Sequence, residues 1–404
     1  MEQILYKLPN SWHWETLTDV TQFIGGSQPP KSEFSDAPKN GYVRLIQIRD
    51  YKTDAHIVYV DKNSTKKFCE SDDVMIGRYG PPVFQILRGL EGAYNVALMK
   101  AVPDEEALSK DYLFDFLQSS PIQNYIIGLS QRAAGQSGVN KKALENYKIP
   151  IPPLTEQKRI VEKLDALLTR IDTAVEHLQK SVALADSLAL NGLDVYFAEL
   201  SEAYEECPLI NLVDFISGYA FKSGDFVAGT GVKPIKITNV GVTEFSDITE
   251  EFLPVDYKDK FNKFSVKNND IVIALTRPII NGGLKVCRVP ESYDGALVNQ
   301  RVAAITSENK NLLDFIYWYL QSSKTKNYIL EKSKSLNQPN LSITDLKNLT
   351  LPFPANQQAI EKAIIDCNDL TTKTRRAKAE VINKIDLLNK LKSSILDSAF
   401  KGQL

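Results

Sequence analysis

Two long segments of the chain place apolar residues at alternating steps of three and four, which is the spacing of one face of a helix. In the first, which starts near Thr155, the apolar positions are Val161, Leu164, Leu168, Ile171, Val175, Leu178, Val182, Ala185 and Ala189. In the second, they are Ile360, Ile364, Cys367, Leu370, Thr374, Ala377, Val381, Ile385, Leu388, Leu391 and Ile395. Each pattern predicts a helix of about 45 residues with a narrow apolar stripe. Because such a stripe cannot hold a helix alone in water, we expect the two helices to pack on each other.

A proline-rich segment precedes each predicted helix. The sequence "IPIPP" occupies residues 149–153, and "LPFP" occupies residues 351–354. Proline lacks a backbone N–H donor and favours an extended conformation in the residue before it, so a strand at this point cannot continue as a helix. Each segment therefore predicts a short strand, then a boundary, then the long helix.

The remaining sequence also occurs as two similar copies. Three pairs of segments match: "VRLIQIRD" (43–50) with "VKPIKITN" (232–239), "DDVMIGRYG" (72–80) with "NDIVIALTR" (269–277), and "GQSGVNKKALENYKIPIPP" (135–153) with "NQPNLSITDLKNLTLPFP" (337–354). The first pair alternates apolar and polar residues, and the second is an acidic turn followed by a short apolar run that ends in a basic residue; both predict strands. The third predicts a polar loop, one helical turn capped by Asn140 or Ser342, and a short strand.

The repeat predicts an α+β fold class. We expect two pseudo-symmetric mixed α/β domains separated by two long antiparallel helices that form a coiled coil. The helices are antiparallel because the second domain must return the chain along the first helix, which also brings the two termini close together. The predicted boundaries are 1–153 for the first domain, 154–202 for the first helix, 203–354 for the second domain and 355–404 for the second helix.

Composition places few limits beyond those of an ordinary globular protein. Of the 404 residues, 43% are hydrophobic and 24% are charged, and the net charge is −2, so a uniformly basic nucleic-acid-binding protein is excluded. The chain has no run of eighteen apolar residues and no secretion signal at its start, so we expect a cytoplasmic protein that does not enter membranes. The cysteines and histidines are far apart, which argues against a metal site: Cys69, Cys207, Cys287, Cys367, His13, His56 and His177.

Signatures of catalysis are present only as fragments. "FIGGSQ" (23–28) lacks the glycine spacing of a dinucleotide or S-adenosylmethionine loop, and "GYAFKSG" (218–224) has Phe221 where a phosphate-binding loop needs glycine. "GPPVF" (80–84) has Gly80 where an amino-methyltransferase needs a side-chain amide. We therefore expect no catalytic residues.

Four segments carry a resemblance to a known family. They are "LPNSWHWETL" (8–17), "IPIPPLTEQKRIVEKLD" (149–165), "SGYAFKSGDF" (217–226) and "SAFKGQL" (398–404). With them, nearly the whole chain resembles the specificity subunit of a type I restriction-modification system. The second copy departs from the family pattern, because Asn356, Gln357 and Gln358 replace its Glu-Gln pair.

The resemblance implies that the two mixed domains are target-recognition domains, each reading one half of a split, asymmetric sequence in double-stranded DNA. The helices would set the length of the unread spacer. The chain would bind two methyltransferase (modification) subunits, and motor-nuclease (restriction) subunits would join them. S-adenosylmethionine, ATP and Mg would be needed only in those partners, and this chain would hold no cofactor.

DNA contacts are expected in polar loops near the predicted strand ends, because arginine pairs with guanine, and asparagine or glutamine pairs with adenine. In the first domain the candidates are Arg78, Tyr79, Gln131, Arg132, Gln136 and Ser137. In the second they are Arg277, Asn281, Lys334, Ser335, Asn337 and Gln338. A solvated turn that satisfies its own backbone is the competing interpretation for each asparagine or serine.

Partner subunits are expected on the outer faces of the long helices. The candidate residues are Glu156, Gln157, Arg159, Lys163, Phe400 and Leu404. Two other functions stay open: target recognition in a methylation-only or other phage-defence complex, and a coiled-coil scaffold whose domains bind proteins.

Overall fold

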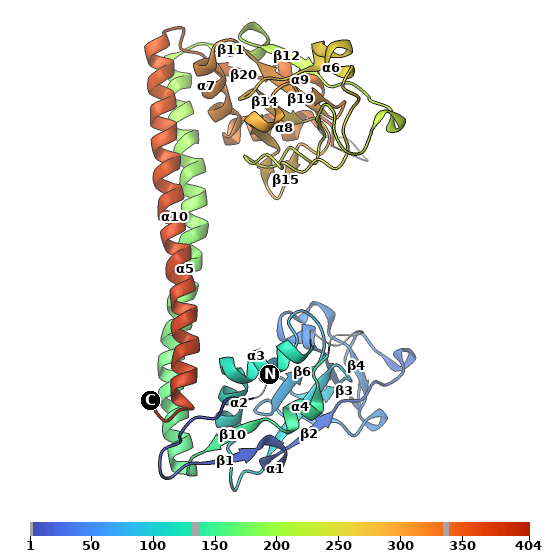
Figure 1. The fold of residues 1–404 in the computed structure, drawn as a ribbon, viewed down its shortest axis with the longest axis vertical. Coiled ribbons are helices and arrows are strands. Elements are labelled where there is room, and N and C mark those ends of the chain that lie inside the picture. The colour runs from blue at the N-terminus through green and yellow to red at the C-terminus, as the bar shows by residue number, and fades with distance from the viewer. Residues whose placement is uncertain (1–2, 131–137, 334–338) are drawn as a thin grey trace. The chain divides into compact units, whose positions relative to one another are not determined.

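The computed structural model describes residues 3–130, 138–333 and 339–404, which form two compact units. The first unit comprises residues 1–178 and 383–404, and the second comprises residues 179–382. Two long helices, α5 (Leu154–Ala203) and α10 (Gln357–Ala399), each contribute one segment to both units (Figure 1). The units divide the chain inside the long helices, so they do not test the domain boundaries expected at the helix ends.

A four-stranded antiparallel sheet forms the centre of the first unit, in the order β2 (Thr21–Gly25), β9 (Leu98–Pro103), β6 (Val74–Gly77) and β7 (Gln85–Leu87). A second sheet has the order β4 (Tyr59–Asp61), β3 (Tyr42–Ile46), β8 (Gly92–Tyr94) and β5 (Phe68–Cys69), with β3 parallel to β8. A separate pair, β1 (His13–Thr16) and β10 (Lys148–Ile151), brings the start of the chain beside the first proline segment.

The second unit repeats the strand order of the first. Its main sheet is β12 (Asp214–Ser217), β19 (Val302–Thr306), β14 (Ile271–Ala274) and β17 (Val286–Arg288). Three strand pairs accompany it: β13 (Pro234–Ile235) with β18 (Leu297–Val298), β11 (Glu206–Pro208) with β20 (Thr350–Pro352), and β15 (Ile279–Ile280) with β16 (Gly283–Leu284). The corresponding order of the main sheets confirms the internal repeat.

Short helices accompany the main sheet in each unit, and most of them share a hydrophobic core with it. The first unit has α1 (Leu17–Val20), α2 (Lys110–Gln118), α3 (Ser120–Ser130) and α4 (Lys141–Glu145), and the second has α6 (Tyr257–Lys260), α7 (Lys310–Leu320), α8 (Ser323–Lys332) and α9 (Ile343–Lys347). The predicted caps are confirmed: Asn140 Oδ1 accepts from the amide of Ala143 at 3.0 Å, and Ser342 Oγ accepts from the amide of Asp345 at 3.0 Å.

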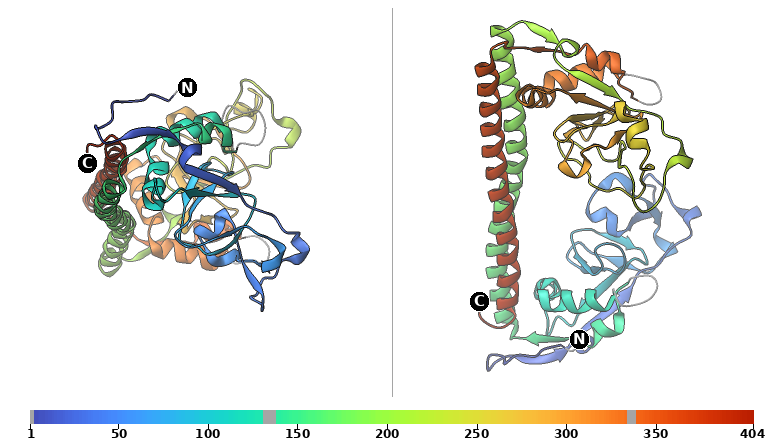
Figure 2. Two further views of the ribbon diagram at one scale, coloured as in Figure 1. Left: turned by 90° about the horizontal axis from the view of Figure 1, so that it is seen from below. Right: turned by 45° about the horizontal axis from the view of Figure 1, so that its top comes forward.

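Within each unit the segments of α5 and α10 pack side by side (Figure 2). Lys392 Nζ lies 2.7 Å from a carboxylate oxygen of Asp172 in the first unit, and Lys378 Nζ lies 2.8 Å from that of Asp186 in the second. Arg159 also bonds the carbonyl of Leu404, so residue numbers rise along one helix as they fall along the other. The helices are therefore antiparallel in each unit, and the expected fold class is confirmed.

One pattern, Leu-Asp-x-x-Phe, occurs near the C-terminal ends of both long helices, at residues 193–197 and 396–400; Phe400 directly follows the last residue of α10. In the first unit, the ring of Phe400 packs edge-to-face on two rings of α2, with centroid distances of 5.1 Å to Tyr112 and 5.2 Å to Phe116. Phe400 is only 2% exposed. The end of the second long helix thus supplies part of the core of the first domain.

Phe197 does the same in the second unit. Its ring lies 5.7 Å from Phe315 and 5.1 Å from Tyr319, both on α7, and it is 2% exposed. Each mixed domain therefore holds a phenylalanine from the helix that belongs to the other half of the sequence.

The aspartate of the same pattern binds the start of a short helix. Asp397 Oδ1 accepts from the amide of Ser120, the first residue of α3, at 3.0 Å. Asp194 Oδ1 accepts from the amide of Ser323, the first residue of α8, at 2.6 Å. A carboxylate is favourable here because the first amides of a helix have no partner inside it and carry partial positive charge.

We expect Phe400→Ala and Phe197→Ala each to destabilise one unit, by about 3–5 kcal/mol, through the lost burial and the cavity left behind. Amide hydrogen exchange measures the effect: F400A lowers protection in α2, and F197A lowers it in α7. The control is Leu188→Ala, since Leu188 is 60% exposed on α5. Equal loss of protection in α2 and α7 from either variant would contradict the unit-specific role.

Asp115, on α2, is a buried carboxyl group, only 4% exposed. Its Oδ2 atom makes no hydrogen bond within the described residues. Burial, followed by the charge of Asp165, raises the pKa of Asp115 to about 7. The folded chain therefore holds a proton that the unfolded chain releases near pH 4.

Stability should consequently fall as pH rises from about 4 to about 7, because the folded state binds more protons across that range. Asp115→Asn keeps the shape of the side chain and removes the charge. We expect D115N to exceed the wild type in free energy of unfolding at pH 8 by about 1–3 kcal/mol, and to match it near pH 4. Denaturant titrations at several pH values measure this, and parallel pH profiles for the two proteins would refute it.

Candidate functional site

Strand β6 in the first unit and strand β14 in the second are each followed by residues that pair with a later segment of the chain, which includes Gly138 or Asn340. In the first unit, the carbonyl of Arg78 accepts from the amide of Val139 at 2.9 Å, and Tyr79 forms a bridge with Gly138. In the second unit, Thr276 forms the matching bridge with Asn340. The structure thus brings Arg78 and Tyr79 beside Gly138, which directly follows residues 131–137 in the chain.

The two candidate arginines do not occupy equivalent positions. The amide of Arg78 donates to the carbonyl of Ala97 at 2.8 Å, and in the second unit the amide of Leu275 makes the matching bond to Arg301 at 2.9 Å. Arg277 lies two residues further on, is exposed and has a φ of 47°. The recurrence of a basic residue near this strand end therefore does not define one repeated contact.

The side chain of Arg78 is half-buried and already has partners. Its Nη1 atom donates to the carbonyl of Val96 at 3.3 Å, and its guanidinium lies 5.2 Å from the centre of the Tyr79 ring. These contacts restrict the guanidinium before any ligand arrives. A restricted arginine loses little entropy on pairing with a base edge or a phosphate.

Asn281 lies in the two-residue turn that joins β15 to β16. Its φ is 47° and that of Gly282 is 77°, which are the left-handed values that an Asn-Gly turn between antiparallel strands requires. Turn geometry alone therefore accounts for Asn281, although its side chain is exposed on the hairpin. A contact with DNA stays a prediction for this residue and for Arg78, Tyr79 and Arg277. The other candidates lie outside the described residues: Gln131, Arg132, Gln136, Ser137, Lys334, Ser335, Asn337 and Gln338.

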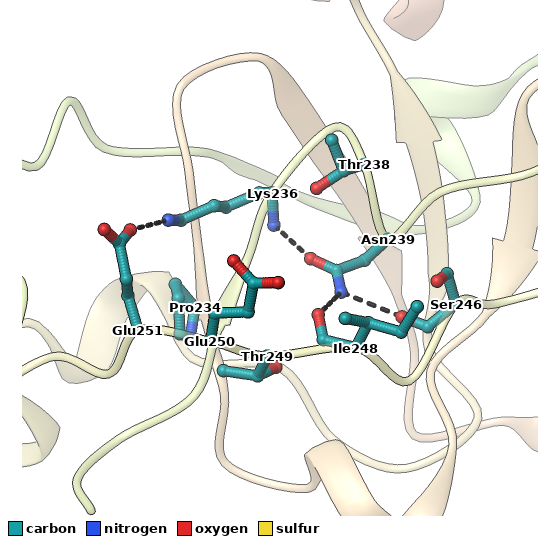
Figure 3. A pocket seen from close by; sticks show the side chains of 9 residues that line it. All are labelled: Pro234, Lys236, Thr238, Asn239, Ser246, Ile248, Thr249, Glu250 and Glu251. Atoms are coloured by element: carbon teal, nitrogen blue, oxygen red, sulfur yellow. Dashed lines mark hydrogen bonds and ion pairs between the residues drawn. The ribbon is translucent and has the colours of Figure 1, made fainter. Parts of the chain in front are cut away.

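A polar pocket of about 360 Å³ lies in the second unit (Figure 3). The amide nitrogen of Asn239 donates to the carbonyls of Ser246 at 2.8 Å and Ile248 at 3.2 Å, so this side chain holds the loop that forms one wall. Lys236 Nζ lies 2.6 Å from a carboxylate oxygen of Glu251. The pocket's lysine is therefore neutralised, and its walls do not favour phosphate.

The sequence patterns did not predict this pocket, because residues 232–239 were interpreted only as a strand. One signal for a turn was present: each of the two matched segments ends in a residue whose side chain can accept a hydrogen bond, Asp50 or Asn239. Asp50 Oδ2 accepts from the amide of Gln47 at 3.0 Å, and Asn239 Oδ1 accepts from that of Lys236 at 2.8 Å. Burial raises the pKa of Asp50, and an asparagine at the second site avoids that cost.

Two of the expected partner-binding residues do not lie on an outer face, and that expectation is wrong for them. Gln157 is 0% exposed and bonds the backbone of Ser109 at 2.9 Å and of Ala107 at 2.7 Å. Phe400 is buried against α2. The apolar stripe of the helix did not predict this burial, because a domain that packs on the helix also buries residues outside the stripe.

The other candidates are accessible at the same helix end. Arg159 forms a two-bond ion pair with Glu156, each bond 2.8 Å, and donates to the carbonyl of Leu404 at 3.0 Å. Lys163 is exposed one turn further along α5. Binding of a partner by any of these residues stays a prediction.

Within residues 3–130, 138–333 and 339–404, no three His, Cys, Asp or Glu side chains form a group that could hold a metal ion, and no helix is long and apolar enough to cross a membrane.

Comparison with known proteins identifies relatives along nearly the full length of the chain. The family "type I restriction modification DNA specificity domain" matches twice, at residues 9–182 and 203–384. The specificity subunit of the type I restriction enzyme MjaVIII from Methanocaldococcus jannaschii is 26% identical, over 98% of this chain and 94% of its own. The EcoBI specificity subunit from Escherichia coli is 23% identical, over 99% of this chain and 88% of its own.

Solved structures have the same fold. A chain from a type I restriction-modification system studied for complex assembly aligns with a TM-score of 0.75 at 18% identity, covering 99% of this chain and all of that one. The HsdS subunit from Thermoanaerobacter tengcongensis aligns with a TM-score of 0.57 at 20% identity, covering 99% of each chain.

Proposed function

The chain belongs to the type I restriction modification DNA specificity domain family, and from this premise we propose that it is a non-catalytic subunit that recognises a bipartite, asymmetric DNA sequence. Each mixed domain reads one half of the target. The observation that carries this proposal is the duplication of one domain with different loops: the strand order repeats, whereas the residues at the strand ends do not. Two domains with one architecture and different surfaces suit two unlike half-sites.

The long helices act as the ruler of this assembly. With 50 residues in α5 and 43 in α10, they are about 75 Å and about 65 Å long at about 1.5 Å per residue. That length corresponds to roughly two turns of B-DNA, so the unread spacer is set by the helices and not by the domains.

The chemistry belongs to partner subunits. Two methyltransferase (modification) subunits, which use S-adenosylmethionine, bind the helix ends, and motor-nuclease subunits that need ATP and Mg join them. The net charge of −2 supports a shared DNA site, because phosphate binding needs a basic surface that this chain does not have overall. The partners complete a clamp around the duplex.

Two alternatives stay open. In the first, the chain directs a methylation-only or other phage-defence complex, which differs only in the absence of motor-nuclease subunits. In the second, it is a protein-binding scaffold. Strong basic patches would argue against the scaffold, and the described residues of the candidate site supply only single arginines.

Methylome sequencing tests the function. We expect deletion of the gene to remove one split methyl-adenine motif, and an unchanged methylome would refute both DNA-reading functions. In the same assay, Arg78→Ala should relax only one half of the motif, and Arg277→Ala only the other, since a lost base contact costs about 1–3 kcal/mol at its own position. A variant that weakens both halves equally would place its arginine on the phosphate backbone instead.

Insertion of four residues, about one turn, into each long helix tests the ruler. We expect the methylated motif to keep both halves and gain spacer bases, because the domains are unchanged and their separation grows. Insertion into a surface loop of one domain is the matched control. A motif with its original spacer in the helix variant would exclude the ruler.

A further inference from the structure

An apolar pocket of about 410 Å³ lies in the first unit, where the start of the chain crosses the end of α10. Aromatic side chains from separate segments line it, together with Asp397 and Lys401 of the C-terminal segment. The aromatic residues are Tyr6, Trp14, Phe116, Tyr125, Tyr147 and Phe400. Tyr6 and Trp14 are held edge-to-face at 5.0 Å, and the hydroxyl of Tyr6 donates to the carbonyl of Phe400 at 2.6 Å. The walls are therefore formed before any ligand binds.

One acidic side chain, Asp397, and one basic side chain, Lys401, line this pocket, and the ammonium group of Lys401 lies 5.9 Å from the Tyr6 ring centre. Asp397 uses Oδ1 for the amide of Ser120, and its Oδ2 atom has no hydrogen bond within the described residues. The carboxylate acts on one aromatic residue of the wall, Tyr147. Burial, then the neighbouring Tyr125 and then Asp397 raise the pKa of Tyr147 to about 12. Aromatic faces also attract cations through their quadrupole. A positively charged, partly apolar group therefore fits both features.

The second unit fills the equivalent place with its own ion pair. Strand register sets Trp14 opposite Pro150 and sets Glu206 opposite Pro352, so Glu206 stands where the first unit has tryptophan. The repeated sequences "FLQSSP" and "YLQSSK" place Lys324 where the first unit has proline. Lys324 Nζ lies 2.5 Å from Glu206 Oε1.

Exposed apolar side chains at the rim of the pocket point to a protein as the source of the cation. Ile4, which lines the pocket, is 90% exposed, and the adjacent Leu5 is 44% exposed. A small cation would leave both in water, whereas a protein surface would cover them. The pocket is also continuous with the end of α10, where Leu404 bonds Arg159.

We propose that this pocket binds one arginine side chain of a partner protein, and that the partner is the modification subunit; the identity of the partner rests on the proposed function. Arginine fits better than lysine, because its planar guanidinium stacks on aromatic rings and can still donate to the carboxylate of Asp397. In the second unit the equivalent place is occupied by Lys324 and Glu206, which form an ion pair with each other. One copy of the partner is anchored in this way and the other is not.

The pocket is tested on the full chain with N-acetyl-arginine amide as the probe. The signal is the indole N–H resonance of Trp14, assigned with Trp14→Phe and followed at constant ionic strength. We expect a saturable shift with the arginine compound and none with its neutral isostere, N-acetyl-citrulline amide. Asp397→Asn keeps the acceptor for Ser120 and removes the charge, so it should weaken binding about tenfold.

Asp194→Asn is the matched control, because Asp194 makes the same backbone contact in the second unit. It should leave the affinity for the arginine compound unchanged. Lys401→Ala should bind the compound at least as well as the wild type, since Lys401 Nζ, 5.9 Å from the Tyr6 ring centre, competes for the same ring. Equal binding of the citrulline compound, or loss of binding in K401A, would overturn the proposal.

Native mass spectrometry with the modification subunit tests the occupant. We expect D397N to weaken one of two bound copies about tenfold and D194N to weaken neither. Unchanged binding of both copies by D397N would overturn the assignment to this partner, as would an arginine-dependent dimer of the chain itself. If the wild type binds no modification subunit at all, the proposed function fails, whereas failure of the arginine compound alone leaves that function intact.

Discussion

The structure depends on contacts between the C-terminal end of each long helix and the mixed domain of the other half of the sequence. Phe400 completes the aromatic core around α2, and Phe197 completes the one around α7. Burial of one aromatic ring contributes about 3 kcal/mol or more, far more than the exposed ion pairs between the helices. The aspartate three residues earlier adds a hydrogen bond to the first turn of α3 or α8. Because these contacts join distant parts of the sequence, neither half holds all the groups its own domain needs.

Much of the fold could be predicted, because its signals are local. The apolar stripes of α5 and α10, the prolines before them and the caps at Asn140 and Ser342 depend on backbone chemistry within a few residues. The burial of Gln157 could not be predicted in this way. Its amide bonds Ala107, fifty residues earlier in the chain, and no helix period encodes such a contact. The Leu-Asp-x-x-Phe repeat was a visible signal, but its meaning depends on the rings it meets.

The candidate DNA-reading residues were harder to predict than the elements that carry them. Arg78 and Arg277 follow matched strands, yet Arg78 is half-buried while Arg277 is exposed and has a left-handed backbone conformation. The difference arises because the two arginines lie two positions apart: Leu275 takes the backbone place of Arg78, and Arg277 takes that of Gly80, whose φ is 98°. The pattern of an apolar strand followed by a basic residue does not reveal this offset. The residues that read a target can thus diverge while the scaffold is kept.

The same divergence affects surfaces away from the strand ends. Two pairs of residues occupy matched places in the two copies: Trp14 and Pro121 in the first, and Glu206 and Lys324 in the second. Asp397 bonds the residue before Pro121, and Asp194 bonds the residue before Lys324. The first pair lies beside an apolar pocket that Asp397 also lines, and the second pair forms an ion pair. A pocket of this kind persists in a folded protein only if its exposure costs less than the stability the rest of the core supplies. Duplication therefore gives this molecule two domains with the same fold. Substitutions at a few contact positions make the surfaces of the two domains different, while the contacts between the long helices and both domains are kept.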